Sequence, residues 1–236
     1  MLLPDIIILA GGLGTRLREE VNNLPKAMAP INGKPFLEYI LEYINQAGFQ
    51  RVILSTGYMS NSIEDYFGNN YKSIKIEYSF EPEPLGTGGA IALALKKVST
   101  PFFIVMNGDT MFRINLQQFF QRQVELLADI SIALRKVEDA SRYGQVTLDH
   151  DNVVTQFKEK SSTPDAGFIN GGIYIIKSKF FKKLSFPEKF SFEKDWLQVE
   201  VNKREILGQV FNDYFLDIGV PEDYKRAQNE FNAFKN

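Results

Sequence analysis

The most constraining feature of this chain is a short apolar run that is followed at once by a glycine-rich loop. Residues 6–9 (IIIL) are large aliphatic side chains, typical of a strand buried on both faces, and Gly11, Gly12 and Gly14 come directly afterwards. In an open α/β sheet, ligands bind at the carboxyl ends of parallel strands, where bare backbone N–H groups can converge on an anion. The N-terminal segment therefore predicts a first strand with an anion-binding loop at its end.

Two cations flank this loop. Arg16 follows the glycines, and Lys26 lies ten residues further on, between Pro25 and Pro30. Taken singly, a solvated surface arginine and a lysine at a helix end explain them equally well, but beside the glycine loop they suit a triphosphate. A Walker A loop ends in Gly-Lys-Ser/Thr, and a dinucleotide fingerprint has a glycine where Leu17 stands. The loop therefore belongs to neither of these two classes.

The run LAGGLGTRLREEVNNLPKAMAPINGKP, residues 9–35, resembles the signature of the sugar-1-phosphate nucleotidyltransferases, which make nucleotide-activated sugars. Within that family, residues 25–41 (PKAMAPINGKPFLEYIL) and 81–91 (EPEPLGTGGAI) are most similar to the D-glycero-α-D-manno-heptose 1-phosphate guanylyltransferases. The resemblance extends from Ile6 to about Tyr224. It implies one Rossmann-like domain over residues 1–236, with a nucleotide-binding half (1–128) and a sugar-binding half (129–236), and without the β-helix extension of many relatives.

The hydrophobic pattern predicts an α/β fold. In the first half, strands at 52–56, 74–80 and 102–106 alternate with helices at 36–47, 62–67, 88–97 and 116–127, the last capped by Asn115. In the second half, short strand-like runs at 130–134, 145–149, 153–157 and 171–176 predominate, and helices return at 179–184, 192–200 and 222–231, with Pro221 at the first helical position. We expect a Rossmann-like mixed, mainly parallel sheet flanked by helices.

Composition narrows the functional classes. The 236 residues are 44% hydrophobic and 24% charged, as in an ordinary globular domain. There is no cysteine and a single histidine, His150 in a turn-like segment, so any metal must be held by oxygen atoms. A net charge of −2 argues against a nucleic-acid surface. Without a signal peptide or an apolar span of ~20 residues, we expect a cytoplasmic protein; the oligomeric state stays open, a homodimer included.

The resemblance implies attack of a sugar 1-phosphate oxygen on the α-phosphorus of a nucleoside triphosphate, with release of pyrophosphate. Both reactants are anions and the nucleophile is already ionised, so the enzyme must align them and neutralise charge rather than supply a base. Arg16 would hold the leaving pyrophosphate, and Lys26 the α-phosphate or the incoming sugar phosphate. With Asp109 they form the expected catalytic set.

Two aspartates at strand ends are the candidate ligands of a magnesium ion. Asp109 follows the buried run FFIVMNG, and Asp217 closes the strand-like run VFNDYFLD. Carboxylate oxygens suit Mg²⁺, which usually takes one or two of them together with phosphates and water. By itself the segment 107–109 is equally well explained as a plain turn. The family resemblance supplies both aspartates as the metal pair.

The same resemblance assigns a nucleotide site and, within it, a residue that reads the base. The site comprises Leu9, Ala10, Gly11, Gly12, Gly14, Thr15, Arg16, Glu81, Gly86, Thr87, Gly88, Asn107 and Gly108. Glu81 aligns with the base-reading position, often a glutamine in thymidylyl- and uridylyltransferases; Glu83 is the alternative reader. A carboxylate only accepts hydrogen bonds. Guanine offers two adjacent donors, whereas uracil and thymine place one donor between two acceptors, so GTP is favoured.

The sugar 1-phosphate site implied by the resemblance lies mostly in the second half. It comprises Lys26, Tyr143, Gly144, Glu159, Lys160, Asn170 and Gly171. Glu159 would hold sugar hydroxyls and Lys160 the sugar's phosphate, whereas an exposed, solvated pair is the alternative. A β-bulge is the alternative at Asn170 and Gly171. Relatives usually carry proline where Ser161 stands, so this loop departs from the family pattern.

The favoured function is a Mg²⁺-dependent guanylyltransferase acting on a manno-configured heptose 1-phosphate. Uridylyl-, thymidylyl- or cytidylyltransferases of another sugar 1-phosphate or of phosphocholine remain alternatives. A glycosyltransferase of similar topology would use an Asp-x-Asp motif, and the segment NGDT at residues 107–110 lacks the second acid. A non-catalytic nucleotide sensor should have lost Arg16, Lys26 or an aspartate, and none is lost.

Overall fold

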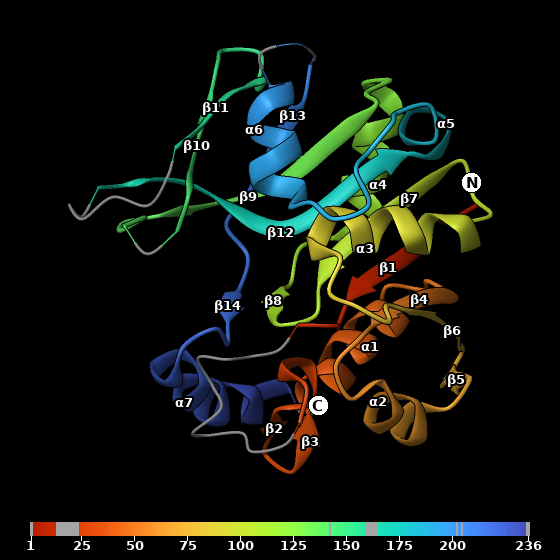
Figure 1. Ribbon diagram of the computed structural model, residues 1–236. Coiled ribbons are helices and arrows are strands. Elements are labelled where there is room, and N and C mark those ends of the chain that lie inside the picture. The colour runs from red at the N-terminus through yellow and green to blue at the C-terminus, as the bar shows by residue number, and fades with distance from the viewer. Residues whose placement is uncertain are drawn as a thin grey trace.

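A mixed ten-stranded sheet forms the centre of the computed structural model, which describes residues 2–12, 24–141, 143–158, 165–201, 203 and 205–234 (Figure 1). Its strands are β1 (Asp5–Leu9), β4 (Arg51–Thr56), β5 (Asn70–Tyr71), β6 (Ile74–Phe80), β7 (Phe102–Asn107), β9 (Ile130–Val137), β10 (Gln145–Leu148), β11 (Val154–Lys158), β12 (Gly167–Lys177) and β13 (Leu207–Phe211). The main path is β11-β10-β12-β7-β1-β4-β6-β5, with β9 beside β12 and β13 beside β9.

The first half of the chain supplies the parallel part of the sheet. β1 lies between β4 and β7, with Ile7 opposite both Ile53 and Val105, and β6 continues the sheet beyond β4. All four strands run in the same direction, so their carboxyl ends meet at one edge. This confirms the strand and helix alternation expected for a Rossmann-like half.

The second half extends the same sheet with antiparallel strands. The long strand β12 pairs antiparallel with β7 on one side and with β9 on the other, and β13 runs parallel to β9. The register of β12 against β9 shifts between Asn170 and Tyr174, and Gly172 there has φ +72°. The mixed sheet expected from the short strand-like runs is thus confirmed.

One expected strand is divided in two. The run 210–217 was expected to form a single strand ending at Asp217, but β13 ends at Phe211 and a separate strand, β14 (Phe215–Asp217), pairs antiparallel with β8 (Thr110–Phe112). The rings of Phe211 and Phe215 both pack edge-on against Phe112, at 6.2 and 5.5 Å between centroids. The turn between the strands lets both phenylalanines reach this one ring.

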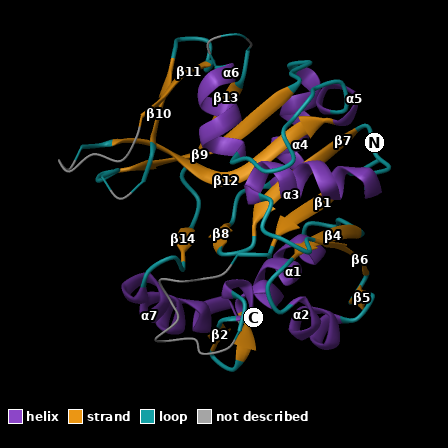
Figure 2. Ribbon diagram, viewed as in Figure 1, coloured by secondary structure: helices purple, strands orange, loops and turns teal. Residues whose placement is uncertain are grey.

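Helices cover both faces of the sheet (Figure 2): α1 (Phe36–Gln46), α2 (Ser60–Phe67), α3 (Gly86–Ala94), α4 (Leu116–Glu125), α5 (Ser178–Phe181), α6 (Gln198–Glu200) and α7 (Pro221–Glu230). Asn115 caps α4 through the backbone N–H of Gln118, as expected. The helix expected at 179–184 is wrong in length, because after Phe181 the backbone N–H groups of Lys183 and Leu184 bond three residues back and the helix ends. The segment Phe192–Leu197 has the wider π-type turns before α6.

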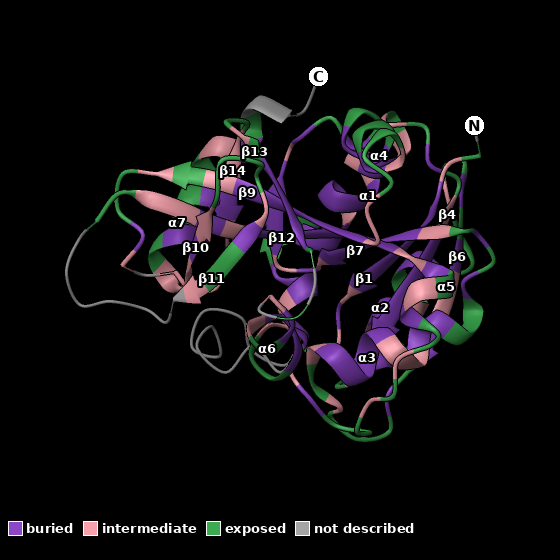
Figure 3. Ribbon diagram, turned by 90° about the horizontal axis from the view of Figure 1, so that it is seen from above, coloured by how far each residue is buried: buried purple, intermediate pink, exposed green. Residues whose placement is uncertain are grey.

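The core has two parts, one on each face of the sheet (Figure 3). Ile6 and Ile8 of β1 pack with α1, α4 and α7, whereas Ile7 packs with α3 and the segment 192–197. This alternation is the side-chain period of a strand buried on both faces. Within the described residues, no helix has the length and apolar character needed to cross a membrane.

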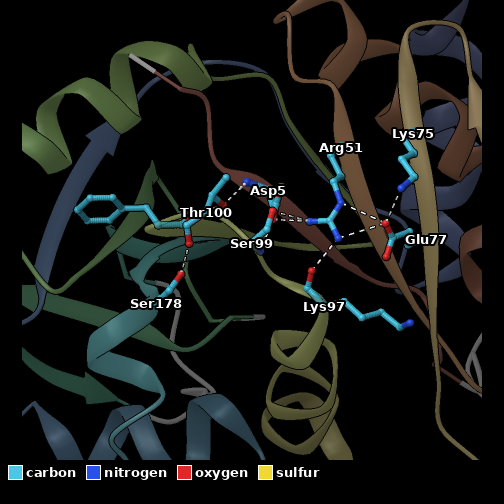
Figure 4. A network of polar contacts seen from close by, with 9 residues as sticks. Asp5, Arg51, Lys75, Glu77, Lys97, Ser99, Thr100 and Ser178 are labelled. Carbon is cyan, nitrogen blue, oxygen red and sulfur yellow. Dashed lines mark hydrogen bonds and ion pairs between the residues drawn. The ribbon is translucent and has the colours of Figure 1, made fainter.

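A polar network closes the amino-terminal edge of the parallel strands (Figure 4). Arg51, at the start of β4, donates to Asp5 of β1 and to the carbonyl oxygen of Lys97, at 2.5 and 2.7 Å. The guanidinium also pairs with Glu77 of β6, and Asp5 accepts from the N–H of Ser99 at 2.8 Å. These groups pair with one another and link the amino-terminal ends of β1, β4 and β6.

Candidate active site

A cavity of about 680 Å³ opens at the carboxyl edge of the parallel strands. It is bounded by the ends of β1, β6 and β7, by the segment after β4 and by the first turn of α3. Its lining consists of Leu9, Gly11, Gly12, Gly57, Tyr58, Phe80, Glu81, Pro82, Pro84, Gly86, Thr87, Ala90, Asn107 and Asp109. Leu9, Gly11, Gly12, Glu81, Gly86, Thr87 and Asn107 come from the nucleotide site expected from the sequence.

The other described members of that expected site lie behind the cavity wall. The N–H of Gly108 donates to the carbonyl oxygen of Leu9 at 3.0 Å, and a Cβ on Gly108 would lie 2.6 Å from that oxygen. Only glycine allows the segments after β1 and β7 to cross this closely. Ala10 is buried, with its N–H on the carbonyl of Ser55, and Gly88 packs beneath the Phe190 ring.

Five residues of the expected sites lie outside the described residues. They are Gly14, Thr15 and Arg16 of the glycine loop, and Glu159 and Lys160 of the sugar site. Their roles therefore stay predictions from the resemblance.

Glu81 forms part of the cavity wall and is 9% exposed. Its Oε1 accepts from the hydroxyl of Ser55 at 3.0 Å, and its Oε2 accepts from the N–H of Leu85 at 3.3 Å. Burial raises the pKa of the carboxyl, and these two hydrogen bonds oppose the rise. Each carboxylate oxygen can accept a second hydrogen bond, so both remain able to accept from a ligand. Glu83, the alternative reader, is exposed and is not part of this lining.

Two aromatic residues border the same cavity. Phe80 ends β6 and Tyr58 lies just beyond β4, the strand paired with β6. Their side chains keep 54% and 40% of their surface exposed. Large rings are usually buried more fully than this. Their faces are therefore available to a planar ligand beside Glu81.

The expected charged residues meet at one place. The Nζ of Lys26 lies 2.5 Å from Asp109 Oδ2 and 3.5 Å from Asp217 Oδ1. Asp109 also borders the cavity, so this trio adjoins the space for the nucleotide. The ammonium stands between two carboxylates that are 83 and 191 residues away in sequence.

Two structural elements hold this trio together. The β8–β14 pairing sets Asp217 opposite Thr110, next to Asp109, and the N–H of Ile218 donates to the Asp109 carbonyl at 3.0 Å. Lys26 begins a 3₁₀ turn, Lys26–Met28. Helix α7 holds Pro30, which lies two residues after this turn. Tyr224 and Gln228 of α7 both donate to the carbonyl oxygen of Pro30, each at 2.7 Å.

The carboxylate oxygens of Asp109 and Asp217 are donors that suit a divalent cation. Burial and then the charge of Asp109 raise the pKa of Asp217, whereas Lys26 and the Gly219 N–H oppose the rise. The backbone of Gly219 packs closely against this group, because a Cβ there would lie 2.9 Å from Asp217 Oδ1 and 3.2 Å from Lys26 Nζ. The described residues contain no cluster of three or more acidic or histidine ligands. A magnesium ion usually takes one or two protein carboxylates together with phosphates and water.

Besides Lys26, the described residues of the expected sugar site are Tyr143, Gly144, Asn170 and Gly171. The ring of Tyr143 packs against Phe215 of β14, 5.9 Å between centroids, and Gly144 follows it. Gly171 packs against the Phe112 ring. Asn170 is committed to internal hydrogen bonds, because its Nδ2 donates to the hydroxyl of Tyr174 at 2.6 Å and its Oδ1 accepts from the Gly172 N–H at 3.0 Å. The register of β12 against β9 shifts at this position, as the β-bulge alternative expects.

Sequence reasoning missed two polar residues behind the site, Tyr174 and Glu193. The Tyr174 hydroxyl donates to Glu193 Oε1 at 3.0 Å, and the Thr87 hydroxyl donates to Glu193 Oε2 at 2.7 Å. Tyr174 lies within an apolar strand pattern, and Glu193 within a helix pattern. Neither pattern carries a signal for a chain of side-chain hydrogen bonds. His150, by contrast, lies in the exposed turn expected for it.

The fold and the site define an α/β protein with a ligand cavity at the strand ends and a pair of aspartates, Asp109 and Asp217, beside it. The chain belongs to the nucleotidyl transferase family, whose model matches residues 5–233. The membership agrees with the resemblance found in the glycine loop.

Individual relatives cover nearly the whole chain. The chain is 47% identical to a D-glycero-alpha-D-manno-heptose 1-phosphate guanylyltransferase of Aneurinibacillus thermoaerophilus, over 98% of this chain and 99% of the relative. It is 46% identical to one of Campylobacter jejuni, over 92% and 96%. Among solved structures, HddC from Yersinia pseudotuberculosis in complex with GMP-PN is 40% identical, with a TM-score of 0.86 over 97% of this chain and 100% of that one. The resemblance to sugar-1-phosphate guanylyltransferases is thus confirmed.

Proposed function

We propose that this enzyme transfers GMP from GTP to D-glycero-α-D-manno-heptose 1-phosphate, giving GDP-heptose and pyrophosphate. The observation that carries the proposal is the acceptor-only carboxylate of Glu81 in the wall of a cavity that also reaches Asp109. The names of the two relatives above, and the bound GMP-PN in the solved relative, support the same assignment. We expect the enzyme to act in the cytoplasm.

The base fits the wall at Glu81. The two carboxylate oxygens accept from guanine N1–H and from the 2-amino group, while each keeps its internal partner, Ser55 or Leu85. Hydrogen bonds to a charged acceptor are stronger than those between neutral groups. A base that presents an acceptor to this wall would be repelled, and uracil and thymine present two.

The chemistry needs alignment and charge neutralisation. A phosphate oxygen of the heptose 1-phosphate attacks the α-phosphorus, a new P–O bond forms, and the α–β P–O bond breaks with release of pyrophosphate. Lys26 supplies a positive charge beside this centre, and Asp109 and Asp217 would hold a magnesium ion. Such an ion stabilises the negative charge that develops on the phosphoryl oxygens. Glu159 and Lys160 would hold the sugar's hydroxyls and phosphate.

The direct test is identification of the product. Purified enzyme is incubated with GTP, heptose 1-phosphate and Mg²⁺, and the nucleotide products are separated and identified by mass spectrometry. We expect GDP-heptose together with pyrophosphate in equal amounts. If GTP is recovered intact while another nucleoside triphosphate is consumed, the guanylyl assignment is wrong.

A second prediction concerns the exposed ring of Phe80. We expect Phe80→Ala to lower the affinity for GTP on the order of 10-fold, because a base stacked on an aromatic face gains roughly 1–3 kcal/mol. Isothermal titration of GTP into the two proteins measures the change. Leu126→Ala, which removes a side chain of similar exposure at the end of α4, is the matched control and should leave the affinity unchanged. Equal GTP affinity in Phe80→Ala would place the base elsewhere.

A further inference from the structure

We propose that Glu193 is a positioning residue that fixes one residue of the nucleotide site and one of the sugar site through a partly buried chain of hydrogen bonds, Thr87–Glu193–Tyr174–Asn170. The proposal rests on the proposed function for the ligand at each end. The chain joins three separate segments: α3, the π-type segment 192–197 and β12. Glu193 lies at its centre and lines neither ligand position itself.

The first arm leads to the nucleotide. Thr87 lies in the first turn of α3 and borders the cavity. Its hydroxyl donates to Glu193 Oε2 at 2.7 Å and accepts from the N–H of Phe192 at 2.8 Å. These two bonds fix the side-chain rotamer, so the Thr87 methyl and the backbone around it have one position relative to a bound nucleotide. Glu193 is therefore the group that holds this part of the wall.

The second arm leads to the sugar. The Tyr174 side chain is fully buried, and its hydroxyl donates to Glu193 Oε1 at 3.0 Å. The same hydroxyl accepts from Nδ2 of Asn170 at 2.6 Å. The Tyr174 ring also packs edge-on against Phe192, with 5.1 Å between centroids. The orientation of Asn170 is thus set by Tyr174, which is fully buried.

The negative charge on Glu193 sets the direction of every bond in this arm. A carboxylate only accepts, so the single hydroxyl proton of Tyr174 must go to Glu193. Tyr174 is then left as an acceptor toward Asn170, which must present its NH₂ group. The Asn170 oxygen consequently faces the Gly172 N–H, 3.0 Å away. The side-chain amide is held in one of its two orientations by a charge two hydrogen bonds distant.

Gly172 extends this arrangement to the cavity. A Cβ on Gly172 would lie 2.7 Å from Nδ2 of Asn107, a cavity residue at the end of β7. The bulged backbone of β12 therefore passes directly beside the nucleotide wall. Asn170 lies two residues before this contact and is oriented by Tyr174.

Three near-isosteric variants separate the arms. Thr87→Val removes the nucleotide arm, Tyr174→Phe removes the sugar arm, and Glu193→Gln removes the fixed direction of both. We expect Thr87→Val to raise KM for the nucleotide about 3- to 10-fold with little change for the sugar phosphate, and Tyr174→Phe to do the reverse. Glu193→Gln should raise both values. Tyr66→Phe, which breaks a tyrosine–glutamate bond between Tyr66 of α2 and Glu38 of α1, is the matched control and should change neither.

Thermal unfolding of each variant and titration with the nucleotide alone are measured in parallel. A nucleotide affinity that falls in Thr87→Val and Glu193→Gln but not in Tyr174→Phe supports the two-arm arrangement. Lower melting temperatures with wild-type KM values and nucleotide affinity throughout would mean that the chain only stabilises the fold, and would overturn the proposal. The nucleotide preference of the wild-type enzyme is measured separately. If the enzyme prefers a nucleotide other than GTP, the KM values and affinities of the variants are measured with that nucleotide, and the test of the two arms still applies.

Discussion

Replacement of Asp109 or Asp217 by asparagine should lower kcat at least about 100-fold while the fold persists. Each substitution keeps the shape of the side chain and removes one of two carboxylates placed on either side of Lys26. The neutral amide is a poor ligand for a hard cation, so negative charge between the two phosphate groups is no longer offset. In Asp217→Asn the side-chain oxygen can still accept from the Gly219 N–H, which lies 2.7 Å away in the native protein. Steady-state turnover over a Mg²⁺ titration measures the effect.

The matched control is Asp213→Asn, an exposed aspartate in the turn just before β14. This variant should turn over at the wild-type rate. Circular dichroism establishes that all three variants are folded. Near-normal turnover of either test variant at saturating Mg²⁺ would exclude a two-aspartate metal site.

Glu81→Gln should weaken the preference of the enzyme for GTP over UTP and dTTP. The amide keeps one acceptor but turns an N–H toward a base donor, so one of two hydrogen bonds to guanine is lost. Hydrogen bonds to a charged group contribute roughly 1.5–3 kcal/mol, so kcat/KM for GTP should fall on the order of 10- to 100-fold. Activity with UTP or dTTP should hold or rise, because those bases accept where guanine donates. Competition assays with mixed nucleotides report the ratio directly.

Glu83→Gln is the natural control for this variant, since Glu83 is an exposed glutamate two residues away. It should leave the preference for GTP unchanged. If Glu83→Gln shifts the preference and Glu81→Gln does not, the base is read by the other carboxylate.

Acidification should mimic Glu81→Gln in the wild-type enzyme. Because burial raises the pKa of Glu81, the loss of GTP preference should begin at a higher pH than for an exposed glutamate.

Much of the fold could be predicted because its determinants are local. The apolar run at residues 6–9 and the alternation of strand and helix patterns identify the parallel half without further information. The division of 210–217 into β13 and β14 could not be predicted from its own residues. It depends on where Phe112 presents its ring to Phe211 and Phe215, which is a contact across about 100 residues of chain.

The candidate site shows the same limit. The glycine loop and Glu81 could be found because short motifs carry them. The family resemblance also identified Lys26, Asp109 and Asp217. It did not predict that the lysine lies between the two carboxylates. The hydrogen bonds of Glu193 with Thr87 and Tyr174 could not be predicted from the sequence. A tyrosine in an apolar strand and a glutamate in a helix pattern become partners only once β12 and the segment 192–197 pack together.

The most direct test of the central claim is pyrophosphate release over a grid of nucleotides and sugar 1-phosphates. GTP, ATP, CTP, UTP and dTTP are each paired with D-glycero-α-D-manno-heptose 1-phosphate, mannose 1-phosphate, glucose 1-phosphate and N-acetylglucosamine 1-phosphate. We predict the highest kcat/KM for GTP with the heptose 1-phosphate, and a strict need for a divalent cation. A preference for UTP, dTTP or CTP would contradict the assignment of guanine to Glu81, and with it the proposed guanylyltransferase function.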